Sequence, residues 1–205
     1  MPTLILNKPY GVLSQFTPEK GSRWRCLKDF CDVPHVYAAG RLDADSEGLL
    51  LLTSNGRLQQ KLTDPRFGHW RSYWAQVEGT PNVEQLEKLR KGLVIKGRQT
   101  RPAKVKPLSD RQLAGLPTRN PPIRERANIP TSWLELSITE GRNRQIRRMT
   151  AAVGLPTLRL IRCQIDLMDQ QEPLNLEGIA PGEWRSTNAI ENKRINQLLS
   201  RRHRV

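Results

Sequence analysis

The sequence patterns predict strands and short helices that are mixed along the chain, which is compatible with an α+β fold. The clearest strand is residues 49–52, four consecutive leucines after Gly48, a pattern typical of a strand buried on both faces. A second strand is predicted over residues 72–78, where two sets of side chains alternate with period two. A helix is predicted where Ile146, Met149 and Val153 recur at helical spacing.

Other elements of the first half follow from local patterns. Strands are predicted at residues 3–7, 12–16 and 36–39, with one helical turn at residues 27–30. Asn55 is a good N-cap for a helix that ends before Pro65, and Asn82 caps a helix that Gly92 ends. Residues 93–108 are predicted to form further strands.

The second half begins with a long loop at residues 109–130, which contains four prolines and four arginines (Arg111, Arg119, Arg124 and Arg126). These arginines are either solvated or available to an anionic partner. Strands are predicted at residues 133–138 and 157–167, and the helix between them has Asn143 as its expected N-cap. Thr187 or Asn188 is expected to cap a last helix, which a basic tail follows at residues 200–205.

The chain carries a large positive charge. It has 34 basic and 20 acidic residues in 205, a formal net charge of +14. Such an excess implies a polyanionic partner, either nucleic acid or an anionic membrane surface. No apolar run approaches the ~20 residues that span a bilayer, and the N-terminus has no pattern of a signal peptide. We therefore expect a cytoplasmic protein without a membrane partner, which binds nucleic acid.

Metal and cofactor motifs are absent from the sequence. The three cysteines form no close pair and there are only three histidines, which makes a zinc site or a disulfide framework a poor explanation. No glycine-rich phosphate loop or dinucleotide fingerprint is present. We expect no metal and, if the protein is an enzyme, no cofactor.

A charged segment precedes the leucine strand. Residues 41–47 hold one cation and three carboxylates: Arg41, Asp43, Asp45 and Glu47. This segment is either a solvated turn or a loop that a core strand holds rigidly, and rigidly held loops commonly carry chemistry.

A basic segment opens the helix after residue 143. Arg142, Arg144, Arg147 and Arg148 fall within seven residues. A helix N-terminus attracts anions, and arginines placed there favour phosphate binding. The alternative is a solvated face, but such faces usually mix both signs of charge.

Four stretches resemble one family. Residues 40–53 (GRLDADSEGLLLLT) resemble the signature of pseudouridine synthases, in the RsuA-like branch that modifies bacterial ribosomal RNA. The string LNKPYGVLS at residues 6–14, the strand around Tyr73 and the string EGRNRQIRRM at residues 140–149 resemble three further elements, in family order. The departures are small: Ser46 stands where Thr is usual, Arg71 where Lys is usual and Ala75 where Val is usual.

The resemblance implies a role for particular residues. Asp43 is expected to be catalytic, Tyr73 to stack on the target base, and Ile146 to pack against that base once it is flipped. Arg147 is expected to face Asp43. RNA-contacting roles are expected for Arg41, Arg142, Arg144, Arg148 and Lys8. Lys8 and Tyr10 are also expected to border the active-site cleft and to help hold the catalytic loop. Asp45 and Glu47 are expected to have loop or RNA-facing roles.

The implied function is isomerisation of a uridine to pseudouridine in ribosomal RNA, without cofactor. Asp43 could attack C1′, take the 2′ proton or add to the uracil ring, and the sequence leaves these open. Many relatives begin with a small RNA-binding domain of the S4 type, whereas the NKP string here starts at Asn7. We expect such a domain to be absent, and the substrate to be large-subunit (23S) rRNA.

The resemblance also implies an architecture: a mixed, mostly antiparallel central sheet flanked by helices, with two lobes and a basic cleft between them. The strand and helix patterns are compatible with this fold but do not specify it. We expect a catalytic domain at residues 1–186, a C-terminal helix and basic tail at 187–205, and a monomer. The alternative is a non-catalytic RNA- or ribosome-binding protein. A nuclease or glycosidase would require a metal cluster or a second paired carboxylate.

Overall fold

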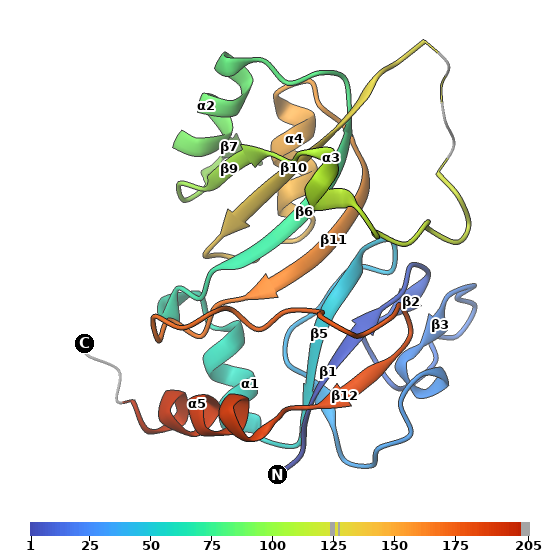
Figure 1. The fold of residues 1–205 in the computed structure, drawn as a ribbon, viewed down its shortest axis with the longest axis vertical. Helices are drawn as coiled ribbons and strands as arrows, with labels where there is room; N and C mark the ends of the chain where they lie inside the picture. The colour runs from blue at the N-terminus through green and yellow to red at the C-terminus, as the bar shows by residue number, and fades with distance from the viewer. Residues whose placement is uncertain (124–125, 127, 202–205) are drawn as a thin grey trace.

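The computed structural model describes residues 1–123, 126 and 128–201, and it contains one large sheet with helices around it (Figure 1). The order of strands is β12-β1-β5-β11-β6-β10-β9, with β4 pairing the end of β5. Their bounds are Trp184–Ser186 for β12, Thr3–Lys8 for β1, Glu47–Thr53 for β5, Thr157–Ile165 for β11, Arg71–Glu78 for β6, Thr131–Ile138 for β10, Lys104–Pro107 for β9 and Tyr37–Ala38 for β4.

Within this sheet β5 and β11 are parallel, and the other pairs are antiparallel. The predicted α+β class and mostly antiparallel sheet are confirmed. Two small sheets, β2 (Val12–Leu13) with β3 (Arg25–Cys26) and β7 (Val94–Ile95) with β8 (Arg98–Gln99), lie apart from it. The strand predicted at residues 12–16 is therefore too long. The two lobes with a basic cleft, and the division at residue 186, stay predictions.

Both faces of β1 and β5 are covered, which explains the unbroken leucine run. Every residue of β5 is buried. On one face Leu49 and Leu51 pack with helix α1 (Gly56–Thr63) and helix α5 (Ala189–Ser200). On the other face Leu50 and Leu52 pack with the segment that contains β2 and a 3-10 turn at Leu27–Asp29.

A second core lies at the other end of the sheet. Alternate residues of β6 are buried, and they pack with helix α2 (Val83–Lys91) and helix α4 (Gln145–Ala152). Figure 1 shows α2 and α4 near β6, β9 and β10, while α1 and α5 lie at the opposite end. A short helix, α3 (Asp110–Leu113), interrupts the long loop, and a 3-10 turn at Pro65–Phe67 follows α1.

The helix starts test the predicted caps. Asn55, Asn82 and Asn188 each accept hydrogen bonds from backbone N–H groups in the first turn of α1, α2 and α5, as predicted. Asn143 is not the N-cap of α4, so that prediction is wrong. Arg144 occupies the cap in the left-handed conformation (φ 51°, ψ 36°) without a side-chain cap. Gln145 instead accepts a hydrogen bond from the Arg142 N–H, 3.0 Å away, which closes the turn.

In the described part of the chain, no helix is long and apolar enough to cross a bilayer. The same residues contain no group of three or more His, Cys, Asp or Glu side chains that could hold a metal ion. Cys26, Cys31 and Cys163 are buried free thiols.

Candidate active site

The charged loop before β5 and the basic segment before α4 face each other across a pocket of about 310 Å³. The pocket brings together six of the nine predicted site residues: Arg41, Asp43, Tyr73, Arg142, Arg144 and Ile146. Its other lining residues are Leu42, Ser46, Ile138, Gly141, Asn143, Gln145 and Leu160.

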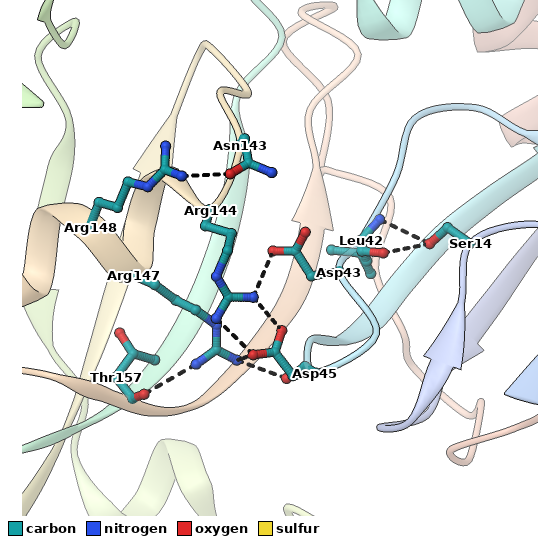
Figure 2. A network of polar contacts seen from close by, with 9 residues as sticks. All are labelled: Ser14, Leu42, Asp43, Asp45, Asn143, Arg144, Arg147, Arg148 and Thr157. Carbon is teal, nitrogen blue, oxygen red and sulfur yellow. Dashed lines mark hydrogen bonds and ion pairs between the residues drawn. The ribbon is translucent and has the colours of Figure 1, made fainter. Parts of the chain in front are cut away.

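Hydrogen bonds from the N-terminal turn hold the loop that carries Asp43. The Ser14 hydroxyl donates to the carbonyl of Leu42 (2.8 Å) and accepts from its N–H (3.0 Å), as Figure 2 shows. The Gly11 N–H donates to the carbonyl of Ala44 at 2.7 Å. Ser14 therefore clamps the backbone beside the catalytic candidate. The sequence identified Ser14 only by its place in a motif, and no local pattern indicated this partner 28 residues away.

Arg144 and Arg147 gather on Asp45 (Figure 2). The two terminal nitrogens of Arg144 donate to the two carboxylate oxygens of Asp45 at 2.9 and 2.8 Å. Arg147 donates to the Asp45 carbonyl at 2.7 Å, and its Nη2 lies 3.6 Å from the Asp45 carboxylate. Arg147 also donates to the carbonyl of Thr157 at 3.1 Å, which links this cluster to β11.

Asp43 has a different cation from the one expected. Its carboxylate lies 3.6 Å from Nη1 of Arg144, while the ion pair of Arg147 is with Asp45. The prediction that Arg147 pairs directly with Asp43 therefore needs correction for this structure. The physical reason is the left-handed turn at Arg144, which begins α4 and directs that side chain toward the loop.

The two aspartates differ in how open they are. The Asp43 side chain is 37% exposed, and within the described residues no donor hydrogen-bonds to its carboxylate. Asp45 is 29% exposed and is saturated by arginine. Burial alone would raise the pKa of Asp45, but the hydrogen bond from Arg144 and the charges of Arg147 and Arg144 outweigh it and lower that pKa. Asp43 is thus the carboxylate that is free to react.

The wall beside Asp43 is largely apolar. Tyr73 extends from β6 and Ile146 from the first turn of α4, and both are buried apart from the edge they present to the pocket. Leu42, Ile138 and Leu160 complete this wall. Such a surface suits a planar ring, because aromatic and aliphatic side chains stack on the faces of nucleobases.

Lys8 is fully buried, so the predicted RNA contact of this residue is wrong. The strand that carries it is covered on both faces, and its Nζ donates to the carbonyls of Val12 (2.8 Å) and Pro9 (3.0 Å). Burial lowers the pKa of Lys8 to about 7, although nearby carboxylates, chiefly Glu47, act in the opposite direction. Lys8 supports the turn from inside.

Glu47 is also buried, which contradicts its expected loop or RNA-facing role. Its carboxylate accepts from Nε and Nη2 of Arg159 at 2.8 and 2.7 Å. Arg148 lies outside the pocket that Asp43 lines and donates to the Asn143 side chain at 2.6 Å. Of the basic positions predicted in the long loop and the tail, Arg124 and residues 202–205 lie outside the described residues.

Comparison with known proteins identifies the family. The family model described as RNA pseudouridylate synthase matches residues 2–152. The chain belongs to this family. The predicted family and enzyme class are thereby confirmed.

Relatives agree with this assignment. The chain is 51% identical over 189 residues to "Ribosomal large subunit pseudouridine synthase E" of Xanthomonas campestris pv. campestris, covering 91% of this chain and 95% of the relative. It is 52% identical to the protein of the same name from Vibrio vulnificus, over 89% of this chain and 73% of that one. A crystal structure of a pseudouridylate synthase superposes with a TM-score of 0.72 at 25% identity, covering 96% of this chain and 73% of that one.

Proposed function

We propose that this protein converts a specific uridine of large-subunit (23S) ribosomal RNA to pseudouridine. The observation that carries the proposal is the open carboxylate of Asp43, which faces Tyr73 and Ile146 across one pocket. The names of the relatives, which specify the ribosomal large subunit, support the choice of RNA. Because a ribosomal substrate is consistent with the bacterial cytoplasm, we propose that the enzyme acts there, as a monomer.

The reaction needs a uracil that can detach from the ribose and turn. The C1′–N1 bond breaks, the uracil turns, and C5 bonds to C1′. The hydrogen at C5 then leaves as a proton, and N1 takes up a proton from solvent. A stacked base cannot turn, so the uridine must flip into a pocket at a cost of a few kcal/mol. Stacking on Tyr73 and packing on Ile146 offset this cost, because base–aromatic stacking contributes about 1–3 kcal/mol.

Asp43 supplies the reactive carboxylate. It either attacks C1′, as the nucleophile of a retaining glycosidase does, or takes the 2′ proton, or adds to the uracil ring. Each route begins from the ionised form. The guanidinium of Arg144 lies 3.6 Å from this carboxylate and leaves its oxygens without a hydrogen bond. Arg41 and Arg142 line the same pocket and are placed to contact the RNA backbone.

The test uses ribosomal RNA labelled with tritium at uridine C5, incubated with the protein and without added metal or cofactor. Turnover releases tritium to solvent. We expect the wild type to release tritium and the Asp43→Asn variant to release none. Asparagine keeps the shape of the side chain, so the variant should bind RNA with the affinity of the wild type. Asp32→Asn, at an exposed position outside the pocket, is the matched control and should behave as wild type.

Two results would count against this proposal. Normal release by Asp43→Asn would remove Asp43 from the chemistry. RNA binding without release, from naked RNA and from assembling particles alike, would favour the non-catalytic RNA-binding alternative.

A further inference from the structure

A second pocket, of about 360 Å³, adjoins the catalytic pocket. The two share Arg142, Asn143 and Gln145, the residues just before and at the start of α4. The turn between β7 and β8 forms the opposite wall. We call this second cavity the hairpin pocket, and its lining residues are Ile95, Lys96, Arg98, Thr100, Arg142, Asn143, Gln145 and Arg148.

The lining of the hairpin pocket has four cationic side chains and no carboxylate. Within the part of the chain that the structure describes, the side chains of Lys96 and Arg98 have no hydrogen-bond or ion-pair partner, and both residues are exposed. The buried carboxylate of Glu140 lies 3.2 Å from Nε of Arg142 and partly balances that charge. It also accepts hydrogen bonds from the Arg101 N–H and the Gln145 side chain. Within the described residues the other three cations, Lys96, Arg98 and Arg148, have no carboxylate partner, so the pocket keeps an excess of positive charge.

Two of the four cations are already held in place. Arg142 donates from Nη2 to the carbonyl of Gln99 at 2.9 Å, which fixes the guanidinium against the hairpin. Arg148 donates to the Asn143 side chain at 2.6 Å. Because these side chains are ordered before binding, less conformational entropy is lost when an anion arrives.

The backbone adds to the attraction. Helix α4 begins at Gln145, which lines this pocket, and has no side-chain cap, so the helix dipole favours a negative charge there. The hairpin itself turns through Lys96 and Gly97, both at positive φ (50° and 72°), a tight turn that presents the Lys96 side chain at its tip.

We propose that the hairpin pocket binds a backbone phosphate of the RNA next to the flipped uridine. This inference rests on the proposed function, because it places that phosphate beside the catalytic pocket. Guanidinium groups pair with phosphate oxygens in a two-pronged geometry, and a shared wall would let one RNA strand occupy both pockets. Lys96 and Arg98 thereby become RNA-positioning residues that no motif of the sequence indicated.

The first experiment compares Lys96→Ala, Arg98→Ala and the double variant with the wild type. Each charge removed should raise the Kd for RNA several-fold and the KM by a similar factor, with a smaller change in kcat. The slope of log Kd against log salt should fall by about 0.7–0.9 for each phosphate that the protein no longer neutralises. Arg57→Ala on α1 and Lys193→Ala on α5 remove the same charges at the opposite end of the molecule and should leave the slope near that of the wild type.

The second experiment locates the phosphate. A short RNA that contains the target uridine is made with one neutral methylphosphonate linkage at a time. Wild type should lose affinity most strongly at one linkage near the uridine, and the Lys96→Ala/Arg98→Ala double variant should show no further loss there. Neutral linkages elsewhere should weaken both proteins equally.

Distinct results overturn the two proposals. Binding and its salt slope are measured without turnover, so they decide the hairpin pocket even if no tritium is released. Equal Kd and slope in the double variant and the two controls would refute the phosphate site. Absence of tritium release from every RNA, with the salt effect present, would refute the proposed reaction and leave a phosphate-binding pocket.

Discussion

Asp43 and Asp45 lie two residues apart on one loop and have opposite environments. Asp45 accepts two hydrogen bonds from Arg144 and is close to Arg147, whereas Asp43 is left without a hydrogen-bond donor among the described residues. A carboxylate that arginines saturate is a poor nucleophile and a poor base. By binding the arginines, Asp45 keeps cations near Asp43 and leaves its oxygens open.

Replacement of Asp45 tests this division of roles. In Asp45→Asn the charge-assisted hydrogen bonds from Arg144 become weaker, and the guanidinium is no longer fixed 3.6 Å from Asp43. We expect a fall in the single-turnover rate of about 10-fold, which corresponds to roughly 1.4 kcal/mol. Stability should change by less than about 1 kcal/mol, because the pair is partly exposed. A wild-type rate would exclude this positioning role.

Lys8 makes stability depend on pH in a defined direction. Its pKa is about 7 in the fold and 10.5 when exposed, so between these values the unfolded chain binds more protons and stability rises with pH. Burial of charged Lys8 therefore destabilises the fold in full below pH 7. As the pH rises above 7, the free energy of unfolding increases, by a few kcal/mol in all. Urea unfolding between pH 7 and 9 should show this rise in the wild type and a flatter curve in Lys8→Met. Parallel curves would contradict the assignment.

At the scale of elements, β5 and β11 pair in parallel directly after the loop that carries Asp43. Gly48 pairs with Arg162, and its φ of +103° suits glycine alone. A Cβ at this position would stand 2.3 Å from the Arg162 carbonyl oxygen. Glycine is thus required at this position for two reasons: its positive φ, and the close approach of β11, whose Arg162 is 114 residues further along the chain.

Gly48→Ala should therefore unfold or severely destabilise the protein, by more than about 3 kcal/mol. The matched control is Gly56→Ala at the first position of α1, where no atom lies within 4 Å of the added methyl group. That change should be neutral or slightly stabilising, because alanine is the better helix former. Thermal melts of the Gly48→Ala and Gly56→Ala variants test this prediction. Comparable melting temperatures would show that β11 can move to make room for the added methyl group.

At the scale of the whole molecule, the sheet joins three core clusters. One surrounds β6 and β10, and the other two pack on the two faces of β1 and β5. They meet where β5 pairs with only two residues of β11. The buried ion pair between Glu47 and Arg159 crosses this short junction, and Arg159 also donates to the carbonyl of Pro117 at 2.8 Å. The junction therefore depends on polar contacts beside a brief stretch of ladder.

Glu47→Ala should cost about 3–5 kcal/mol, because it leaves the Arg159 guanidinium buried without its counter-charge. The double replacement Glu47→Leu/Arg159→Met removes both charges and should recover most of that loss. Urea unfolding of the single and double variants measures the coupling. Equal losses in both would mean that the ion pair itself, rather than the cost of a lone buried charge, stabilises the junction.

Much of the fold was predictable, because its local signals are strong. The leucine run of β5, the alternation of β6 and the caps at Asn55, Asn82 and Asn188 are properties of short segments, and each appears where it was expected. The failures at Lys8 and Glu47 have one cause. A charged residue on a strand is expected to be exposed until the elements that cover both of its faces are known.

The sequence by itself determined the elements, the positive charge, the family resemblance and the choice of Asp43, because these depend on residue type and spacing. Only the tertiary structure decided which arginine lies near Asp43, that Ser14 clamps its loop, and that Lys96 and Arg98 join Arg142 and Arg148 around a second pocket. These contacts join segments that are distant along the chain. Their partners are set by how β5, β11 and α4 pack together, and no local pattern records that arrangement.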